Sequence, residues 1–174
     1  MAVHPIRLLG DPVLRMKARR VTRIDDSIRA LVRDMIESMY AARGVGIAAP
    51  QIGVPLRVIV IGLPDEEPFA LVNPEIVKRE GQRRVEEGCL SIPGYRAMVP
   101  RSVTVVARGL DLQGRMVRIK ASAKGGERDA LLAQALEHEV DHINGTLYID
   151  HLDSLDELVK IGEEAPELEE EKGR

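Results

Sequence analysis

Aromatic residues and cysteine are scarce in this chain of 174 residues, which has no Trp, one Phe, three Tyr and one Cys. Any core must therefore be aliphatic, and a nucleic-acid surface built on base stacking is disfavoured. A single Cys excludes an internal disulfide and favours a reducing, cytoplasmic location. The net charge of −3 gives no basic excess, so no DNA partner is expected.

Long hydrophobic runs are missing as well. The N-terminal stretch MAVHPIRLLGDPVL has no apolar segment of signal-peptide length, and it is not the Arg- and Ser-rich helix of a transit peptide. No apolar run approaches the roughly 18 residues that cross a bilayer. With 44% hydrophobic and 30% charged residues, the chain is expected to be soluble and globular, with no membrane partner.

A helix start is expected at Asp11 and Pro12, and three further helices are expected after it. Apolar residues recur at helical spacing over residues 28–40, and an aspartate pair just before them can cap the helix. A second helix is expected over residues 128–143, where Asn144-Gly145 supplies the usual C-terminal stop. A short extended piece at TLYID and a last helix near residues 154–161 follow.

Strands are expected between the first two long helices. Segments that favour them are residues 56–61, 70–73, 76–78, 84–86, 102–107 and 116–120. A turn over residues 111–114 makes the last two a hairpin. This order of elements indicates an α+β fold with mainly antiparallel strands. No linker divides the chain, so residues 1–162 are expected to form one catalytic domain. Residues 163–174, with six acids and two bases, are expected to form a solvated, mobile tail.

The stretch HEVDH places His138 and His142 four residues apart on an expected helix. Residues at i and i+4 lie on one helix face, so both imidazoles can reach one ion. Leu131 and Ala135 continue that face, which is apolar up to the histidines. Glu139 can touch a metal-bound water without ligating the ion. The alternative is a surface helix with chance histidines, but two of only four histidines fall in this pattern.

Two histidines leave a divalent ion short of ligands, because a catalytic site usually has three protein ligands and one open position. Cys89 in VEEGCLSIPGY is a candidate for the third, and Gly88 beside it lets backbones come close. By itself, a free thiol is more often a small buried hydrophobic side chain. A metallopeptidase with its third ligand downstream of the helix is another alternative, and His151 would then be available.

Three segments together resemble the signature motifs of peptide deformylases: GVGIAAPQ at residues 44–51, EGCLS at 87–91 and HEVDH at 138–142. The family patterns are GxGxAAxQ, EGCxS and HExxH, in this order. The resemblance runs from RLLGDPVLR to GTLYIDHL, most of the chain. It implies antiparallel β-sheets that surround a central helix carrying the HExxH motif. It also implies a hydrolase of linear amides, not peptide bonds, that removes the formyl group from the N-terminal formyl-methionine of newly made polypeptides.

The resemblance also implies roles for single residues. The implied metal ligands are Cys89, His138 and His142. Glu139 would be the general acid/base while metal-bound water or hydroxide attacks the formyl carbon, and the Gln51 amide and the Leu90 N–H would donate to the oxyanion. The residues implied to contact the substrate are Gly44, Val45, Gly46, Glu87, Gly88, Leu131 and Ala135. Small residues in GVGIAA would let a peptide add as a strand, whereas a plain loop is the alternative for this segment.

Further expectations concern residues around the site. Arg96 and Asp141 are expected in structural roles, an ion pair and a hydrogen bond behind the ligands. Glu137 stands where the family commonly has Gln, and it is expected to face away from the ion. A deformylase-like binding protein without turnover is the last alternative, although this chain keeps Glu139 and Gln51, which an inactive relative would be free to lose.

The expected cofactor is one divalent ion per chain. A Cys/His/His set suits iron(II), zinc, nickel or cobalt. The resemblance favours iron(II) as the native ion, with zinc, nickel or cobalt in preparations. The expected partners are N-formyl-methionyl nascent peptides. Some bacterial relatives dock a C-terminal helix on the ribosome, but an acidic tail disfavours that contact with RNA.

Overall fold

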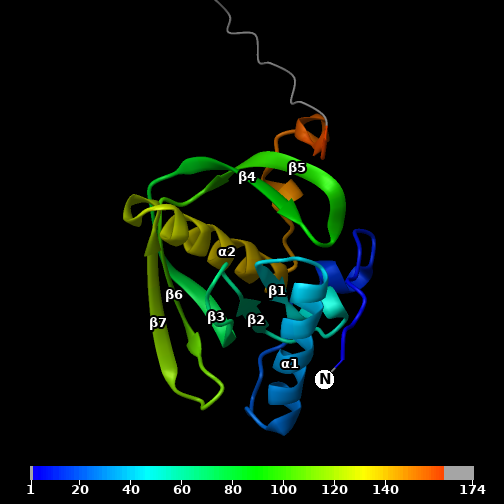
Figure 1. Ribbon diagram of the computed structural model, residues 1–174, viewed down its shortest axis with the longest axis vertical. Coiled ribbons are helices and arrows are strands. Elements are labelled where there is room, and N and C mark those ends of the chain that lie inside the picture. Colours follow the sequence, from blue (N-terminus) through cyan, green and yellow to red (C-terminus); the bar gives the residue numbers. More distant parts are fainter. Residues whose placement is uncertain (1, 163–174) are drawn as a thin grey trace, which may run out of the picture.

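The computed structural model describes residues 2–162, so the tail predicted at residues 163–174 lies outside the described residues. Its long central helix, α2 (Glu127–Ile143), lies between two antiparallel sheets (Figure 1). The five-stranded sheet has the order β1 (Gly46–Ala48), β2 (Val58–Ile61), β3 (Phe69–Glu80), β6 (Thr104–Leu110) and β7 (Met116–Ser122). The smaller sheet has the order β4 (Arg83–Cys89), β5 (Ile92–Arg101) and β8 (Val159–Lys160). The predicted α+β fold, with antiparallel sheets around the helix that carries HExxH, is confirmed.

Around β1 and β2 the five-stranded sheet is buried on both faces because helices cover each of them, whereas β7 alternates exposed and half-buried residues. Every residue of β2 is buried, yet its side chains alternate as in any strand. Ile59 and Ile61 pack into the cluster beneath α2, whereas Val58 and Val60 pack into the cluster with α1 (Asp26–Ala41). This double burial explains why the strand is a continuous apolar run without polar alternation.

The two long helices begin and end as the sequence predicts. The carboxylate of Asp25 accepts hydrogen bonds from the backbone N–H groups of Ser27 and Ile28 and so caps α1. At the C-terminal end of α2, Gly145 has a φ of +77°, which glycine adopts without strain. Neither these helices nor any shorter one among residues 2–162 has the length and apolar character needed to cross a bilayer.

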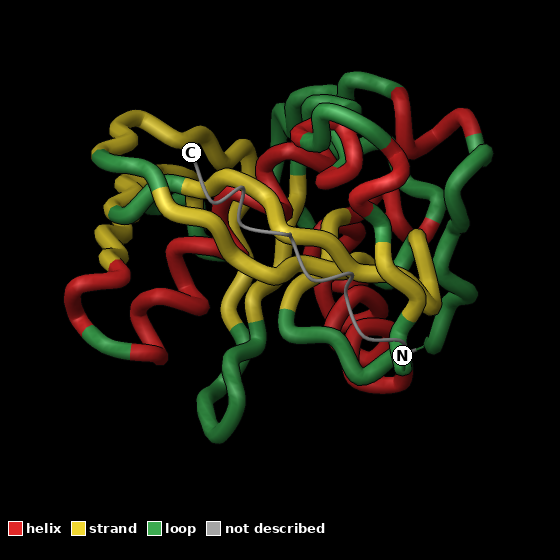
Figure 2. Tube along the Cα trace, turned by 90° about the horizontal axis from the view of Figure 1, so that it is seen from above, coloured by secondary structure: helices red, strands yellow, loops and turns green. Residues whose placement is uncertain are grey.

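Short 3₁₀ helices complete the chain: η1 (Pro12–Arg15), η2 (Ala49–Ile52), η3 (Ala123–Gly125), η4 (Tyr148–His151) and η5 (Leu155–Glu157). The N-terminal segment before η1 runs along one side of the molecule as a loop (Figure 2).

The prediction of a helix near residues 154–161 is wrong. Ser154 caps only the single turn η5, and the chain then extends into β8, which pairs with the edge of β5. The extended piece expected at TLYID is also wrong in part, because the carboxylate of Asp150 accepts from the Leu147 N–H and closes the turn η4. β5 was not predicted, since its sequence IPGYRAMVPR holds two prolines, which disfavour a strand.

Candidate metal centre and active site

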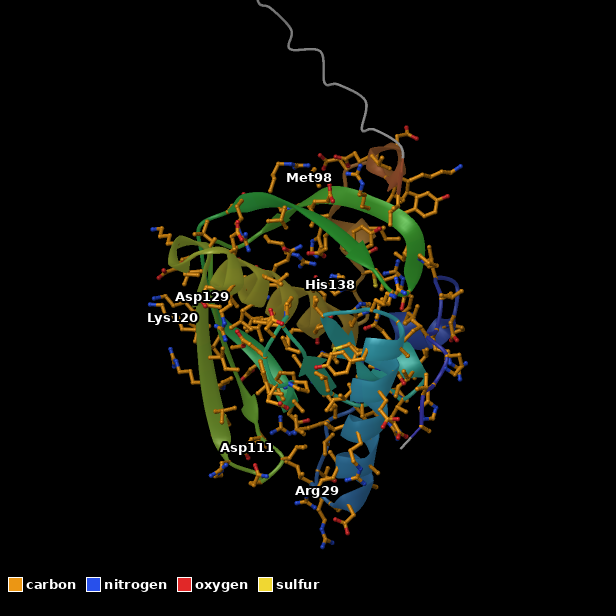
Figure 3. The ribbon with its side chains drawn as sticks, in the orientation of Figure 1. Arg29, Met98, Asp111, Lys120, Asp129 and His138 are labelled. Atoms are coloured by element: carbon orange, nitrogen blue, oxygen red, sulfur yellow. The ribbon has the colours of Figure 1, made fainter. Side chains whose placement is uncertain are left out.

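Three possible ligand atoms converge between the end of β4 and α2. Cys89 comes from the end of β4, whereas both histidines come from α2, on which His138 is visible in Figure 3. The Cys89 Sγ lies 3.3 Å from the His142 Nε2, and the two Nε2 atoms lie 3.2 Å apart. All three atoms fall within 4.8 Å of one another. Tetrahedral coordination at ordinary bond lengths requires about 3.6 Å between sulfur and nitrogen and about 3.3 Å between nitrogens, so the residues fit one divalent ion.

A local irregularity in β4 aims Cys89 at the helix. The register between β4 and β5 shifts between Glu87 and Cys89, as in a β-bulge, which bends a strand and redirects a side chain. Gly88 lies at the shift, where an added Cβ would be 3.2 Å from the carbonyl oxygen of Tyr95. The glycine therefore permits the close approach that turns the thiol inward.

Glu87 orients the first histidine from behind. Its carboxylate accepts a hydrogen bond from Nδ1 of His138 at 2.7 Å, which leaves the Nε2 lone pair directed at the ligand cluster. Arg101 donates Nε and Nη2 to the same carboxylate at 3.0 and 2.6 Å. Burial raises the pKa of Glu87, but the hydrogen bonds from His138 and Arg101 outweigh it and hold the pKa at about 2. The carboxylate is therefore ionised at neutral pH.

The network continues away from the ligands. Asp141 accepts from Nη1 of Arg101 at 2.7 Å and from Nε2 of His151 at 2.8 Å. His151 is thus engaged behind the site and is not among the converging ligand atoms, which disfavours a downstream third ligand. Arg96 forms an ion pair with Glu86 at 2.6 Å, in keeping with a structural role.

Glu137 faces away from the ligands, as expected. One oxygen accepts from the Ser102 N–H at 2.7 Å and the other from Nε of Arg79 at 3.3 Å. The carboxylate therefore links α2 to the connection between β5 and β6 and to β3.

Glu139 is buried beside the ligands. Within the described chain its Oε2 has no hydrogen-bond partner, and its Oε1 lies against Gly46, where an added Cβ would approach to 2.5 Å. Burial raises the pKa of Glu139 to about 7. A carboxyl group that titrates near neutral pH can both accept and return a proton, and the buried oxygen without a partner leaves it free to do so.

Gln51 is held in a fixed orientation. Its Oε1 accepts from the Ala48 N–H at 3.0 Å, and its Nε2 donates to Ser91 Oγ at 3.2 Å and contacts Cys89 Sγ at 3.7 Å. The side-chain N–H group is therefore presented beside the ligands. Leu90, which follows Cys89, lines the cleft that opens over the ligands.

A cleft of about 580 Å³ opens over these groups. Its walls include all seven residues that the sequence places at the substrate: Gly44, Val45, Gly46, Glu87, Gly88, Leu131 and Ala135. The carboxylate of Glu87, however, is turned toward His138 and Arg101. The roles of these residues toward a substrate stay predictions.

Several residues around the site were not foreseen. Arg101 holds Glu87 as described, and the ring of Tyr148 stacks on His138 with centroids 6.4 Å apart. Arg43 and Tyr95 line the cleft at its rim. No spacing rule points to them, because they reach the site from β5, from η4 and from the end of α1.

The sequence profile described as polypeptide deformylase matches residues 3–158. The chain belongs to the polypeptide deformylase family. A peptide deformylase of Dehalococcoides mccartyi is 53% identical over 96% of this chain and 98% of its own length. One of Thermomicrobium roseum is 44% identical over 98% of this chain and 97% of its own.

Solved deformylase structures share the fold. A crystal structure of peptide deformylase from Legionella pneumophila has a TM-score of 0.82 and 44% identity, covering 90% of this chain and 89% of its own. The Synechococcus elongatus enzyme, crystallised with actinonin, has a TM-score of 0.80 and 42% identity, covering 87% and 80%. Peptide deformylases are metalloenzymes, and this deformylase has a possible metal site in Cys89, His138 and His142.

Proposed function

We propose that this chain removes the formyl group from the N-terminal formyl-methionine of newly made polypeptides, as a hydrolase of linear amides rather than peptide bonds. The observation that carries the proposal is the convergence of Cys89, His138 and His142 beside the buried carboxyl group of Glu139. We also propose residues 1–162 as the single catalytic domain, in a cytoplasmic protein.

Each side chain at the site has a separate role in formamide hydrolysis. Cys89, His138 and His142 would hold the ion, which lowers the pKa of a coordinated water and polarises the formyl oxygen when bound. Glu139 accepts a proton from the attacking water and passes it to the leaving amine. The Gln51 amide and the Leu90 N–H donate to the formyl oxygen as it gains negative charge, and each such donor typically contributes about 10²–10³ in turnover.

The substrate peptide would lie along the segment from Gly44 to Gly46. Small side chains there let a peptide backbone approach and pair as an added strand. Gly44 supports the close packing, because a Cβ at this position would be 2.8 Å from Cδ1 of Leu90. Val45 and Gly88 would contact the peptide backbone, and Gly46, Leu131 and Ala135 would shape the methionine pocket with Glu87.

Iron(II) is the proposed native ion, with zinc, nickel or cobalt replacing it in preparations. Anaerobic purification with elemental analysis tests this choice. Full activity of a protein that contains only zinc would contradict it. The acidic composition of residues 163–174 disfavours a ribosome contact through them, because RNA phosphates repel carboxylates.

Formate release from formyl-Met-Ala-Ser tests the activity. The acetylated peptide should resist, and Glu139→Ala should keep the metal but lose turnover. Cleavage at an internal peptide bond would instead indicate a metallopeptidase, and metal binding without formate release would indicate a binding protein.

A further inference from the structure

Arg43 stands at the mouth of the cleft, where α1 has ended and β1 is about to begin. Its backbone is left-handed, with a φ of +58°, and its N–H donates to the carbonyl of Tyr40 at 3.0 Å. Glycine is usual at this position after a helix, because a side chain disfavours positive φ. The constrained backbone therefore fixes where the exposed arginine side chain leaves the chain, at the rim of the cleft.

The other charged side chains of the cleft are neutralised or buried. Glu86 pairs with Arg96 at 2.6 Å, Glu87 pairs with buried Arg101, and Glu139 is enclosed beside the ligands. Within residues 2–162, Arg43 makes no ion pair. The rim of the cleft, as far as the structure describes it, thus carries one uncompensated positive charge.

Arg43 lies close to the expected path of the residues that follow the formyl-methionine of a substrate. It lies two residues from Val45, which the proposed function places against the substrate backbone. Whatever the backbone conformation, Cα atoms two residues apart are at most about 7 Å from each other, and both Arg43 and Val45 line the cleft. A peptide leaving the metal centre along this edge therefore carries its second and third side chains past the guanidinium group, whose planar donors suit a carboxylate.

We propose that this deformylase favours formyl-methionyl peptides with Asp or Glu as the second or third residue, and that Arg43 determines the preference. This inference rests on the proposed function. Because the contact is exposed to solvent, the preference should be modest and sensitive to salt.

The test compares peptides that differ by one charge. The kcat/KM for formate release is measured at low ionic strength for formyl-Met-Ala-Glu against formyl-Met-Ala-Gln and for formyl-Met-Glu-Ala against formyl-Met-Gln-Ala, all with amidated C-termini. The acidic peptide of at least one pair should be favoured about twofold to fivefold. Arg43→Gly, which suits the left-handed backbone, should abolish the preference, Arg43→Glu should reverse it and Arg43→Lys should retain it.

Arg33 supplies the matched control, because it is an exposed arginine of α1 that does not line the cleft. Arg33→Gln removes the same charge and should leave the preference intact. Equal rates for Glu and Gln peptides in the unchanged protein, or an undiminished preference in Arg43→Gly, would overturn the inference. Failure of every formylated peptide to release formate would instead refute the proposed function on which it rests.

Discussion

The contact between Arg101 and Glu87 should be among the most costly in the protein to break. Their side chains are only 2% and 4% exposed, and two hydrogen bonds join the guanidinium to the carboxylate. Arg101→Met would leave that carboxylate buried with His138 and a longer contact from Gln134. Removing one partner of a buried ion pair costs about 3–5 kcal/mol. For a domain of this size, the loss corresponds to a fall in Tm of about 6–20 °C.

Urea denaturation of the metal-loaded proteins measures this cost. Arg128→Met is the matched control, because Arg128 pairs with Glu66 at 2.7 Å on the exposed surface; its midpoint should stay nearly unchanged. The double variant Arg101→Met/Glu87→Gln should regain part of the stability, since neither buried charge remains. An Arg101→Met protein as stable as the Arg128→Met protein would refute the reasoning.

The same change should also weaken the metal site. Glu87 would lose the group that holds it against His138, and such supporting contacts typically contribute 10–100-fold in metal affinity. Competition with a chelator measures the affinity. Unchanged affinity in Arg101→Met would show that Glu87 orients His138 without help from the arginine.

Three further predictions concern single positions. Gly46→Ala should lower kcat by about 10²-fold without loss of bound metal, because the added Cβ would displace the Glu139 carboxyl group; wild-type turnover would contradict this placement. Gln51→Ala should lower kcat by about 10²–10³-fold, and an unchanged kcat would remove it from the oxyanion site. Burial raises the pKa of Asp150, but the hydrogen bonds from Arg15 and the Leu147 N–H outweigh it and lower the pKa below 3.8. The ionised Asp150 carboxylate therefore stabilises the fold at neutral pH, and this stabilisation is lost as the pH falls through the lowered pKa. Urea midpoints of wild type and Asp150→Asn at pH 7 and pH 3 measure the difference in stability between the two proteins. This difference should be smaller at pH 3, and a larger difference at pH 3 would contradict the prediction.

The part of the site that lies on one helix could be predicted from spacing alone. His138 and His142 share a face because helix geometry brings i and i+4 together. Cys89 could be joined to them only through the family resemblance, since its approach depends on the bulge at Gly88 and on how β4 crosses α2. Arg101 could not be predicted at all, because its contacts come from packing between distant segments.

The fold divides in a similar way. Long periodic helices such as α1 and α2 could be predicted from the sequence, because the spacing of one apolar face and the residues that end the helix are enough to locate them. β8 was mistaken for part of a helix because a two-residue strand is decided by its partner, the edge of β5, and not by local preference. The prolines of β5 concealed a strand whose pairing with β4 holds it in place.

The central claim is that Cys89, His138 and His142 hold one ion beside Glu139. X-ray absorption spectroscopy at the metal edge, on protein purified without oxygen and containing one metal per chain, tests it most directly. One sulfur and two imidazole nitrogens should surround the ion, and the sulfur should disappear in Cys89→Ser. A coordination sphere of nitrogen and oxygen alone in the unchanged protein would contradict the account.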